Sequence, residues 1–323
     1  MAKTPARLPL VQLPTPIHRL SRLSEELGLD LWIKRDDLTG LALGGNKGRK
    51  LEYLMAEAQA QSANAVVTCG ALQSNFVRQL AAACSMLKMR CVAAVMKLPY
   101  SEENGKPQGS GLSEKGGNVL LDELFGAELH LFPDGDWLDL YAQAENIGLR
   151  LESQGARVYR VPVGGSSPLG GYAFFMAAQE IAKQQPPFDF IVTSTSSGST
   201  QAGLGYALHK TSTRLIGVAA DPEPDLCEDV LRVGSGLADL LDTDSMGEKH
   251  FDVRTQWAGP AYGLPSEIGN QAIQRMARSE GVVLDPIYTG KAFAGLLDLA
   301  EQREIKGRVL FWHTGGVPAL FAV

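Results

Sequence analysis

Short apolar runs alternate with amphipathic stretches along most of the chain. Runs such as 65–68 and 91–95 are rich in Val and Ala, and their length is typical of buried strands. After Lys47, apolar residues recur at spacings of three and four between 51 and 58, which predicts one apolar helix face. Strands are expected within 31–40 and at 65–68, 91–95, 129–131, 157–161, 188–193, 215–219 and 309–312. Helices are expected after Lys47 and at 20–27, 73–87, 119–125, 137–154, 170–183, 201–210, 227–233, 267–279 and 290–304.

This alternation of strands and helices predicts an α/β protein whose parallel strands are covered by helices. At 323 residues, the chain is long enough for two lobes that share an interface or for one large unit. The stretch 101–117 is polar and rich in glycine, so it is either a flexible surface loop or a substrate lid.

Composition narrows the classes of partner. Hydrophobic residues make up 45% of the chain, and the net charge of −6 comes without a lysine or arginine cluster, so neither nucleic acid nor an anionic membrane is expected. The four cysteines have no metal-like spacing, which is typical of core residues in a reducing compartment and predicts no metal site. Without a secretory h-region or about 18 consecutive apolar residues, the sequence predicts a cytoplasmic protein.

Lys47 follows two glycines and an asparagine and begins a predicted helix. The helix dipole disfavours a further positive charge at that end, so the amine should lose its proton more readily than a surface lysine does. A neutral amine is the form that Schiff-base chemistry requires. The alternative is a glycine turn followed by an ordinary solvated lysine.

The segment STSSGSTQAGLG, 194–205, follows a predicted buried strand and opens a helix. Hydroxyls and backbone N–H groups at such a turn can surround an anion, and the natural phosphate ligands are Ser197, Gly198, Ser199 and Thr200. Neither nucleotide-binding glycine fingerprint is met, so the segment suits a cofactor monophosphate better than a triphosphate. The alternative is a capped helix after a flexible turn.

A second polar turn, TCGALQSNFVRQ, stands between a predicted strand and helix at 68–79. Gln73, Ser74 and Asn75 either cap the helix or face a cleft at the carboxyl end of the strand, where open α/β sheets bind ligands.

Two turns near the C-terminus, DPIYTGKAF and HTGGVPALF, each place a threonine beside glycine. These residues are Thr289 and Thr314. Tyr262 and Tyr288 are either packing residues with a bonded hydroxyl or members of a site. His313 alone is more typical of a structural histidine than of a base.

Together these motifs resemble the fold-type II, tryptophan-synthase-β-like enzymes that use pyridoxal phosphate, and more narrowly the 1-aminocyclopropane-1-carboxylate deaminase/D-cysteine desulfhydrase family. The resemblance runs nearly end to end, through PTPIHRL, WIKRDDLTG, GGNKGRKLEYL, QSN, VPVGGSS, SGSTQAG, YGLP, DPIYTGK and HTGGVPAL. It implies two open, mainly parallel twisted sheets flanked by helices, with pyridoxal 5'-phosphate in the cleft between two domains. A large domain is expected at 1–50 plus 158–323, and a small one at 51–157.

The resemblance also implies roles for single residues. Lys47 corresponds to the lysine that forms the Schiff base with the cofactor, and Asn75 to the asparagine near its phenolic oxygen. Ser74, with Asn75 and Gln73, is expected at the substrate, and the phosphate loop falls on Ser197 to Thr200. Tyr262 and Tyr288 correspond to the active-site tyrosines.

Two positions bear on the substrate. Cyclopropane-carboxylate deaminases carry glutamate and leucine where this chain has Thr289 and Thr314, and the threonine pair resembles D-cysteine desulfhydrases. A neutral hydroxyl beside the pyridine nitrogen makes a weaker electron sink than a carboxylate, which suffices when a β-substituent leaves readily. Phe76 departs from the histidine that often follows QSN in desulfhydrases.

The resemblance therefore implies β-elimination from a small amino acid, most simply D-cysteine to pyruvate, hydrogen sulfide and ammonia, in a homodimer. L-cysteate sulfo-lyase and 1-aminocyclopropane-1-carboxylate deaminase are alternatives on the same scaffold. A non-catalytic binding protein for pyridoxal phosphate or an amino acid is an alternative of another class. A dinucleotide oxidoreductase is disfavoured, because no G-x-G-x-x-G is present.

Overall fold

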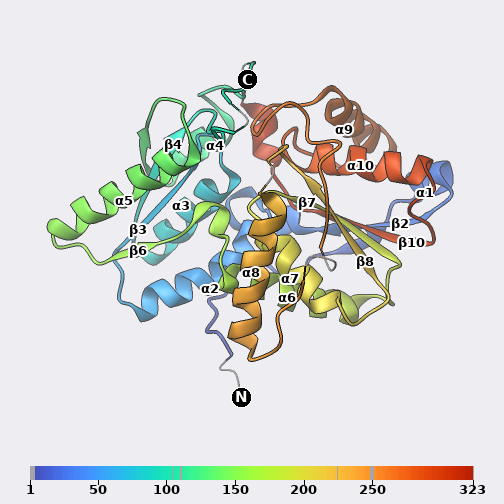
Figure 1. Cartoon of the computed structure of the whole chain (residues 1–323), viewed down its shortest axis with the longest axis horizontal. Helices are drawn as coiled ribbons and strands as arrows, with labels where there is room; N and C mark the ends of the chain where they lie inside the picture. Colours follow the sequence, from blue (N-terminus) through green and yellow to red (C-terminus); the bar gives the residue numbers. More distant parts are fainter. Residues whose placement is uncertain (1–3, 104, 110, 224, 248–250, 323) are drawn as a thin grey trace.

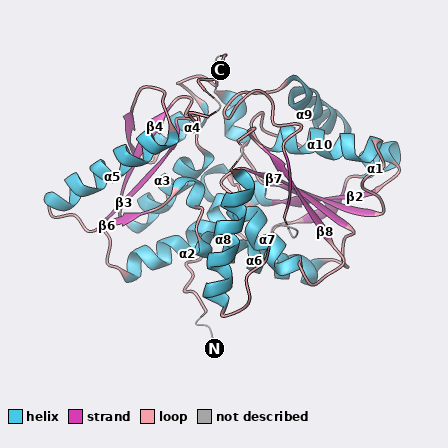
Figure 2. Cartoon of the chain, viewed as in Figure 1, coloured by secondary structure: helices cyan, strands magenta, loops and turns pink. Residues whose placement is uncertain are grey.

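Two sheets, each flanked by helices, form the frame of the chain in the computed structural model (Figures 1 and 2). The structure describes residues 4–103, 105–109, 111–223, 225–247 and 251–322. In Figure 1 the smaller sheet lies on the left and the larger one on the right, with α6, α7 and α8 below and between them.

The larger sheet has six strands in the order β1-β2-β10-β7-β8-β9. Their bounds are β1 Ile17–Arg19, β2 Asp30–Arg35, β10 Arg308–His313, β7 Phe190–Thr195, β8 Arg214–Ala219 and β9 Asp252–Arg254. Only β1 is antiparallel to its neighbour, and the other pairs run parallel. Parallel strands leave their carboxyl ends at one edge of the sheet, which is where open α/β sheets bind ligands.

Alternate residues of each strand face opposite layers, because the side-chain period of a strand is two. On β10, Val309 and Phe311 pack with α1, α9 and α10, whereas Leu310 and Trp312 pack with α6, α7 and α8. Burial on both faces explains why these strands read as continuous apolar runs in the sequence.

The smaller sheet has four parallel strands in the order β5-β4-β3-β6. Their bounds are β5 Glu128–Leu131, β4 Arg90–Met96, β3 Ala65–Ala71 and β6 Val158–Arg160. Along β3, Val67 packs with α5 on one face, whereas Val66 packs with α2 and α3 on the other.

The helices connect the strands, as a parallel sheet requires. Their bounds are α1 Ser21–Leu27, α2 Lys47–Ala60, α3 Asn75–Leu87, α4 Gly117–Leu124, α5 Trp137–Ser153, α6 Pro168–Gln184, α7 Ser199–Leu208, α8 Leu226–Leu241, α9 Glu267–Glu280 and α10 Thr289–Glu301. None of the helices in the described ranges has the length and apolarity that crossing a membrane would need.

The predicted fold class, with two mainly parallel sheets between helices, is confirmed. Two edge strands, β1 and β9, were not predicted; each has three residues and is only partly buried, so it carries little apolar signal. The boundary expected after residue 157 leaves β6 in the large domain, but β6 pairs with β3 in the smaller sheet. The domain division itself stays a prediction.

Candidate active site

A cavity of about 490 Å³ opens between the two sheets, beside a narrower crevice. The residues shared by the walls of both are Lys47, Asn75, Ser196, Ser197 and Tyr288. They come from the start of α2, from the turn after β3, from the turn after β7 and from the N-terminal side of α10. The carboxyl ends of strands from both sheets therefore meet at one site.

Lys47 is the first residue of α2, and its amine faces the site. A Cβ atom added to Gly164 would lie 2.5 Å from Ser197 Oγ and 3.5 Å from Lys47 Nζ, so the amine lies close to the serine-rich turn. Burial lowers the pKa of Lys47 to about 8, although a hydrogen bond with Lys50 opposes that shift. The lowered pKa agrees with the expectation, and burial is its largest cause.

Lys50 was not assigned to the site from the sequence. It lies one turn beyond Lys47, is fully buried and donates to Gly164 O at 3.1 Å, and it lines the narrow crevice. Burial, and then the charge of Lys47, lower the pKa of Lys50 well below its usual value. The spacing of three residues along one helix was the signal that could have placed it beside Lys47.

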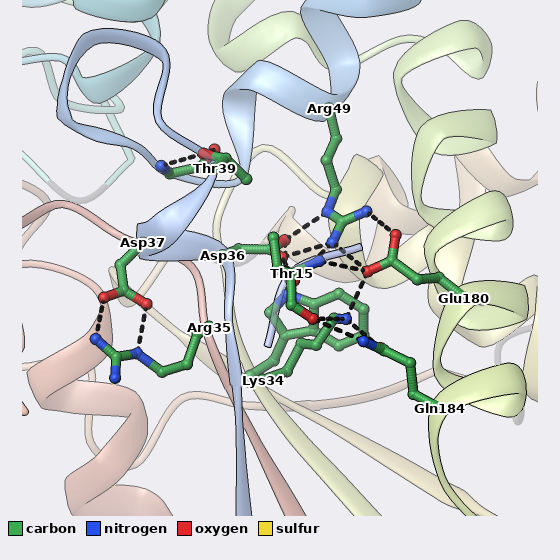
Figure 3. A network of polar contacts seen from close by, with 11 residues as sticks. Thr15, Lys34, Arg35, Asp36, Asp37, Thr39, Arg49, Glu180 and Gln184 are labelled. Atoms are coloured by element: carbon green, nitrogen blue, oxygen red, sulfur yellow. Dashed lines mark hydrogen bonds and ion pairs between the residues drawn. The ribbon is translucent and has the colours of Figure 1, made fainter. Parts of the chain in front are cut away.

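The position of α2 is fixed by a buried ionic network on its far side (Figure 3). Arg49 of α2 donates to Asp36 Oδ1 at 2.8 Å and Oδ2 at 2.9 Å, and to Glu180 of α6 at 2.9 Å. Lys34 of β2 binds the same Glu180, and Trp312 of β10 donates to Asp36. The network joins α2 to α6 and to two strands of the larger sheet, two residues away from Lys47.

The charges in this network neutralise one another. Burial alone would raise the pKa of Glu180, but Arg49 and Lys34 lower it to about 2. Burial alone would lower the pKa of Arg49, but Asp36 and Glu180 raise it above its usual value. Glu180 and Arg49 are therefore both charged at neutral pH, and each is held in place by its partners.

The serine-rich turn carries the features of an anion site. Gly198 has φ +87°, and a Cβ there would lie 3.0 Å from Val230 N, so this position requires glycine. Gly198 precedes α7, and Gly198 and Thr200 at this helix N-terminus line the crevice. Ser199, the first residue of α7, is fully buried and lies outside the walls of both the cavity and the crevice. Asn46, next to Lys47, donates to Thr200 Oγ1 at 3.1 Å.

Two hydroxyls here are buried without a partner among the described residues, Thr195 Oγ1 and Ser199 Oγ. A buried hydroxyl without a partner is unfavourable, so the Thr195 hydroxyl, which lines the crevice, fits a ligand that would accept or donate a hydrogen bond. On the opposite side of the crevice, Ser194 and Thr314 hydroxyls contact each other at 2.9 Å. Ser194 was not expected at the site. Thr314, which was expected, lines the crevice.

Ser74 and Asn75 stand where β3 gives way to α3. The Ser74 hydroxyl caps α3 by accepting from Phe76 N and Val77 N, and Ser74 also lines the cavity, so both interpretations of this residue hold. Asn118 of α4 donates to Asn75 Oδ1 at 3.0 Å. This bond sets the orientation of the Asn75 amide and leaves its NH₂ as the group that can meet a ligand.

The structure corrects the expectation that Gln73 contacts the substrate. Its amide nitrogen donates to Ser113 O and Gly116 O, and its amide oxygen accepts from Asn118 N. Gln73 also lies outside the walls of both the cavity and the crevice. It fastens the end of the polar loop to the turn that carries Ser74.

Tyr262 and Tyr288 meet at the cavity with their hydroxyl oxygens 2.6 Å apart. Burial raises the pKa of Tyr262 to about 12, and burial together with Tyr262 raises that of Tyr288 well above its usual value. Both phenols are therefore neutral at physiological pH and able to donate a proton. Trp137 of α5, not predicted from the sequence, contacts the Tyr262 ring edge-on at 5.5 Å between ring centres.

Thr289 is the second correction. Its hydroxyl donates to Asp285 Oδ2 at 2.6 Å and accepts from Asp285 N at 2.8 Å, and it lies outside both walls. Asp285 also accepts from the backbone N–H groups of Ile287, Tyr288 and Thr289. This turn orients Tyr288, and it uses the donor of the Thr289 hydroxyl and one of its two acceptor lone pairs.

His313 has the structural role that the sequence favoured. Nε2 contacts Val283 O at 2.9 Å, and Nδ1 accepts from Gly315 N at 3.1 Å. Burial lowers its pKa, so the imidazole is neutral.

Comparison with known proteins gives a consistent picture. Residues 8–315 match the family model described as pyridoxal-phosphate dependent enzyme. The chain is 44% identical to the D-cysteine desulfhydrase of Yersinia enterocolitica, with 98% of this chain and 95% of that protein aligned. It is 42% identical to the D-cysteine desulfhydrase of Serratia proteamaculans over the same shares.

Among solved structures, the chain is similar to one described as an ACC deaminase homologue. The TM-score is 0.88 at 35% identity, and the match covers 98% of this chain and 94% of that one. An O-ureido-L-serine synthase matches with a TM-score of 0.64 at 19% identity, over 95% of this chain and 90% of that one, which is a likeness of fold alone.

Proposed function

Because the chain belongs to the family of pyridoxal-phosphate-dependent enzymes, we propose that it is a carbon–sulfur lyase that converts D-cysteine and water to pyruvate, hydrogen sulfide and ammonia. The observation that carries this proposal is the position of Lys47. Lys47 is half-buried, and its amine, with a pKa lowered to about 8, lies between the serine-rich turn and a cavity large enough for an amino acid.

The residues present fit pyridoxal phosphate. Among the described residues, the Thr195 and Ser199 hydroxyls are buried without a partner, and the N-terminus of α7 supplies partial positive charge for a phosphate. The Lys50 amine lines the crevice as a further hydrogen-bond donor. Ser197, Gly198 and Thr200 complete the turn that would hold this phosphate.

On the ring side, the Asn75 amide would meet the phenolic oxygen, and the Thr314 and Ser194 hydroxyls would face the pyridine nitrogen. Among the described residues, no carboxylate lines the crevice. Without a carboxylate beside it, the pyridine ring is a weaker electron sink, which suits a substrate whose β-substituent is a good leaving group.

When bound, the cofactor supplies an electron sink for the pair left on Cα when its proton is removed. Lys47 provides the base, because an amine with a pKa near 8 is largely neutral just above physiological pH. Ser74 and Asn75, at the N-terminus of α3, would hold the substrate carboxylate and so present the Cα–H bond to that amine.

Tyr288 and Tyr262 are the proton donors in this proposal. Their raised pKa values keep both phenols protonated, and the 2.6 Å contact lets one hydroxyl stabilise the other while a proton passes to the departing sulfur. Asp285 positions Tyr288 through its backbone N–H.

The test is a pyruvate and sulfide assay of the holoenzyme across D-cysteine, L-cysteine, L-cysteate and 1-aminocyclopropane-1-carboxylate. D-Cysteine should be the preferred substrate, and Lys47→Ala should abolish both turnover and the visible absorbance of the lysine-bound cofactor. Lys183→Ala, an exposed lysine of α6, is the matched control and should keep both. Turnover in Lys47→Ala, or preference for another of these compounds, would contradict the proposal.

We also propose a homodimer in the cytoplasm. Leu120 and Leu124 on α4 and Phe321 beside it are 50%, 70% and 67% exposed, and such an apolar surface supports burial against a second copy. Light scattering after size-exclusion chromatography should give twice the mass of the chain. A Leu124→Glu variant should shift that mass to the monomer.

A further inference from the structure

The charged side chains that line the cavity holding Lys47 are mostly carboxylates. Four carboxylates follow the carboxyl end of β8 or stand on α8, and we call them the acidic wall: Asp221, Glu223, Asp225 and Asp229. Glu102, Glu103 and Asp136 line the cavity from the smaller-sheet side. Among the lining residues that the structure describes, Lys47 is the only lysine or arginine.

Lys47 forms no ion pair with these carboxylates or with any other of the described residues. Burial, opposed by a hydrogen bond with Lys50, lowers its pKa to about 8. Ser74 and Asn75 stand at the N-terminus of α3, where the dipole favours the substrate's own carboxylate. The acidic wall therefore faces the remaining part of an amino acid, which is the substituent on its β-carbon.

The members of the acidic wall differ in how much charge they present. Burial raises the pKa of Asp221 to about 7, and Asp229 pairs with Arg232, so both are partly compensated. Asp225 is exposed and stands at the N-cap of α8 without a side-chain cap bond. Its charge is therefore open to a ligand, and its replacement costs no capping interaction.

The same cavity also offers unshielded apolar surface. Trp137 and Tyr141 of α5 stack with ring centres 6.2 Å apart, and Tyr141 and Leu138 keep 42% and 73% of their surface exposed. Exposed aromatic and aliphatic side chains inside a cleft favour an apolar group of the ligand. This observation is independent of the charges and indicates a substituent longer than a thiol.

We propose that this cavity selects D-amino acids whose β-thioether substituent is uncharged or cationic, and that the acidic wall rejects anionic substituents. The inference rests on the proposed β-elimination. The Cα–H and Cβ–S bonds break, the sulfur takes a proton and leaves as the free thiol, and water converts the remaining fragment to pyruvate and ammonia. A substrate with a β-sulfonate is disfavoured, because its negative charge would face the carboxylates of the acidic wall.

Three thioethers that share a two-carbon chain on sulfur test the charge selection: S-(2-aminoethyl)-, S-ethyl- and S-carboxymethyl-D-cysteine. At low ionic strength, kcat/KM of the holoenzyme should be at least about tenfold higher for the aminoethyl than for the carboxymethyl compound, with the ethyl compound between. Because salt screens exposed charges, the ratio should shrink in about 0.5 M sodium chloride.

Asp225→Lys should narrow the ratio of kcat/KM for the aminoethyl compound to that for the carboxymethyl compound roughly ninefold. The substitution changes the charge at this position by two, and each unit of charge should change the ratio about threefold. Glu25→Lys, an exposed glutamate on α1, makes the same change of net charge far from the cavity and should leave the ratio unchanged. Glu223→Gln with Asp225→Asn should narrow it in the same direction without introducing a lysine.

Binding without turnover separates this inference from the proposed function. D-Lysine, D-norleucine and D-2-aminoadipate have carbon in place of sulfur. The change in tryptophan fluorescence on titration reports their dissociation constants, because Trp137, one of four tryptophans, lines the cavity. In the wild type, D-lysine should bind most tightly and D-2-aminoadipate most weakly. Asp225→Lys should reduce the difference between their dissociation constants. Equal affinities, or ratios that Asp225→Lys and Glu25→Lys change alike, would overturn the inference. Absence of pyruvate release from D-cysteine with the charge order intact would overturn only the proposed function.

Discussion

Asp36→Ala should lower the free energy of unfolding by about 3–5 kcal/mol, because it breaks the buried network that fixes the Lys47 helix (Figure 3). The side chain of Asp36 is fully buried. It accepts four hydrogen bonds of 2.8–2.9 Å, two from Arg49, one from Thr15 and one from Trp312. The substitution leaves Arg49 and Lys34 facing the single carboxylate of Glu180.

The magnitude follows from what is left unpaired. Removing one partner of a buried ion pair typically costs about 3–5 kcal/mol, because the remaining charge stays in a poorly solvated place. The Trp312 N–H adds about 1–3 kcal/mol when it loses its acceptor. Glu180 still neutralises part of the charge on Arg49, so the total should stay near the range given by the ion pair alone.

Urea unfolding at pH 7, followed by circular dichroism, measures this change. The matched control is Glu128→Ala, which removes a carboxylate from an exposed pair with Arg90 whose side chains are 49% and 44% exposed. That pair should contribute less than about 1 kcal/mol. A loss below about 1.5 kcal/mol for Asp36→Ala, or a loss equal to that of Glu128→Ala, would refute the reasoning.

Three further predictions concern the site. The rate at which the apoprotein condenses with pyridoxal phosphate should rise with pH and level off above about 8, since only the neutral Lys47 amine reacts; a rate that keeps rising past pH 10 would contradict the lowered pKa. Gly164→Ala should weaken cofactor retention at least tenfold in dialysis, because Gly164 has φ +63° and an added Cβ would clash with Ser197 of the serine-rich turn. Gly155→Ala is the control and should leave retention unchanged, because Gly155 also has a positive φ, +88°, but has nothing within 4 Å of an added Cβ. Thr289→Ala should lower the free energy of unfolding by about 1–3 kcal/mol in denaturant titrations while the cofactor spectrum stays the same; a shifted spectrum would instead indicate a ring contact.

The sequence predicted the fold well where the apolar pattern is long. The strands β3, β4, β7, β8 and β10 are buried on both faces, so their runs stand out from their surroundings. The edge strands β1 and β9 are short and half exposed, and their pairing depends on neighbours far along the chain. Tertiary contacts, rather than local preference, decide such strands.

The candidate site was partly predictable for a similar reason. Small-residue turns after strands pointed to Lys47, Ser74 and the serine-rich turn, because chain connectivity alone puts such turns at the carboxyl edge of a sheet. Whether a side chain at that edge faces the ligand or its own backbone depends on partners elsewhere. Gln73 and Thr289 both stand in matching motifs, yet their hydrogen bonds go to the polar loop and to Asp285.

The sequence by itself therefore determined the succession of strands and helices, the turns where chemistry gathers and the lysine among them, since each is a local pattern. Only the tertiary structure decided how these parts act together. It placed the half-buried Lys47 beside the buried Lys50, paired the two tyrosine hydroxyls and set carboxylates from distant segments around one cavity. The physical reason is that burial and charge neighbours, which control a pKa and the potential of a cavity, come from residues far apart in the chain.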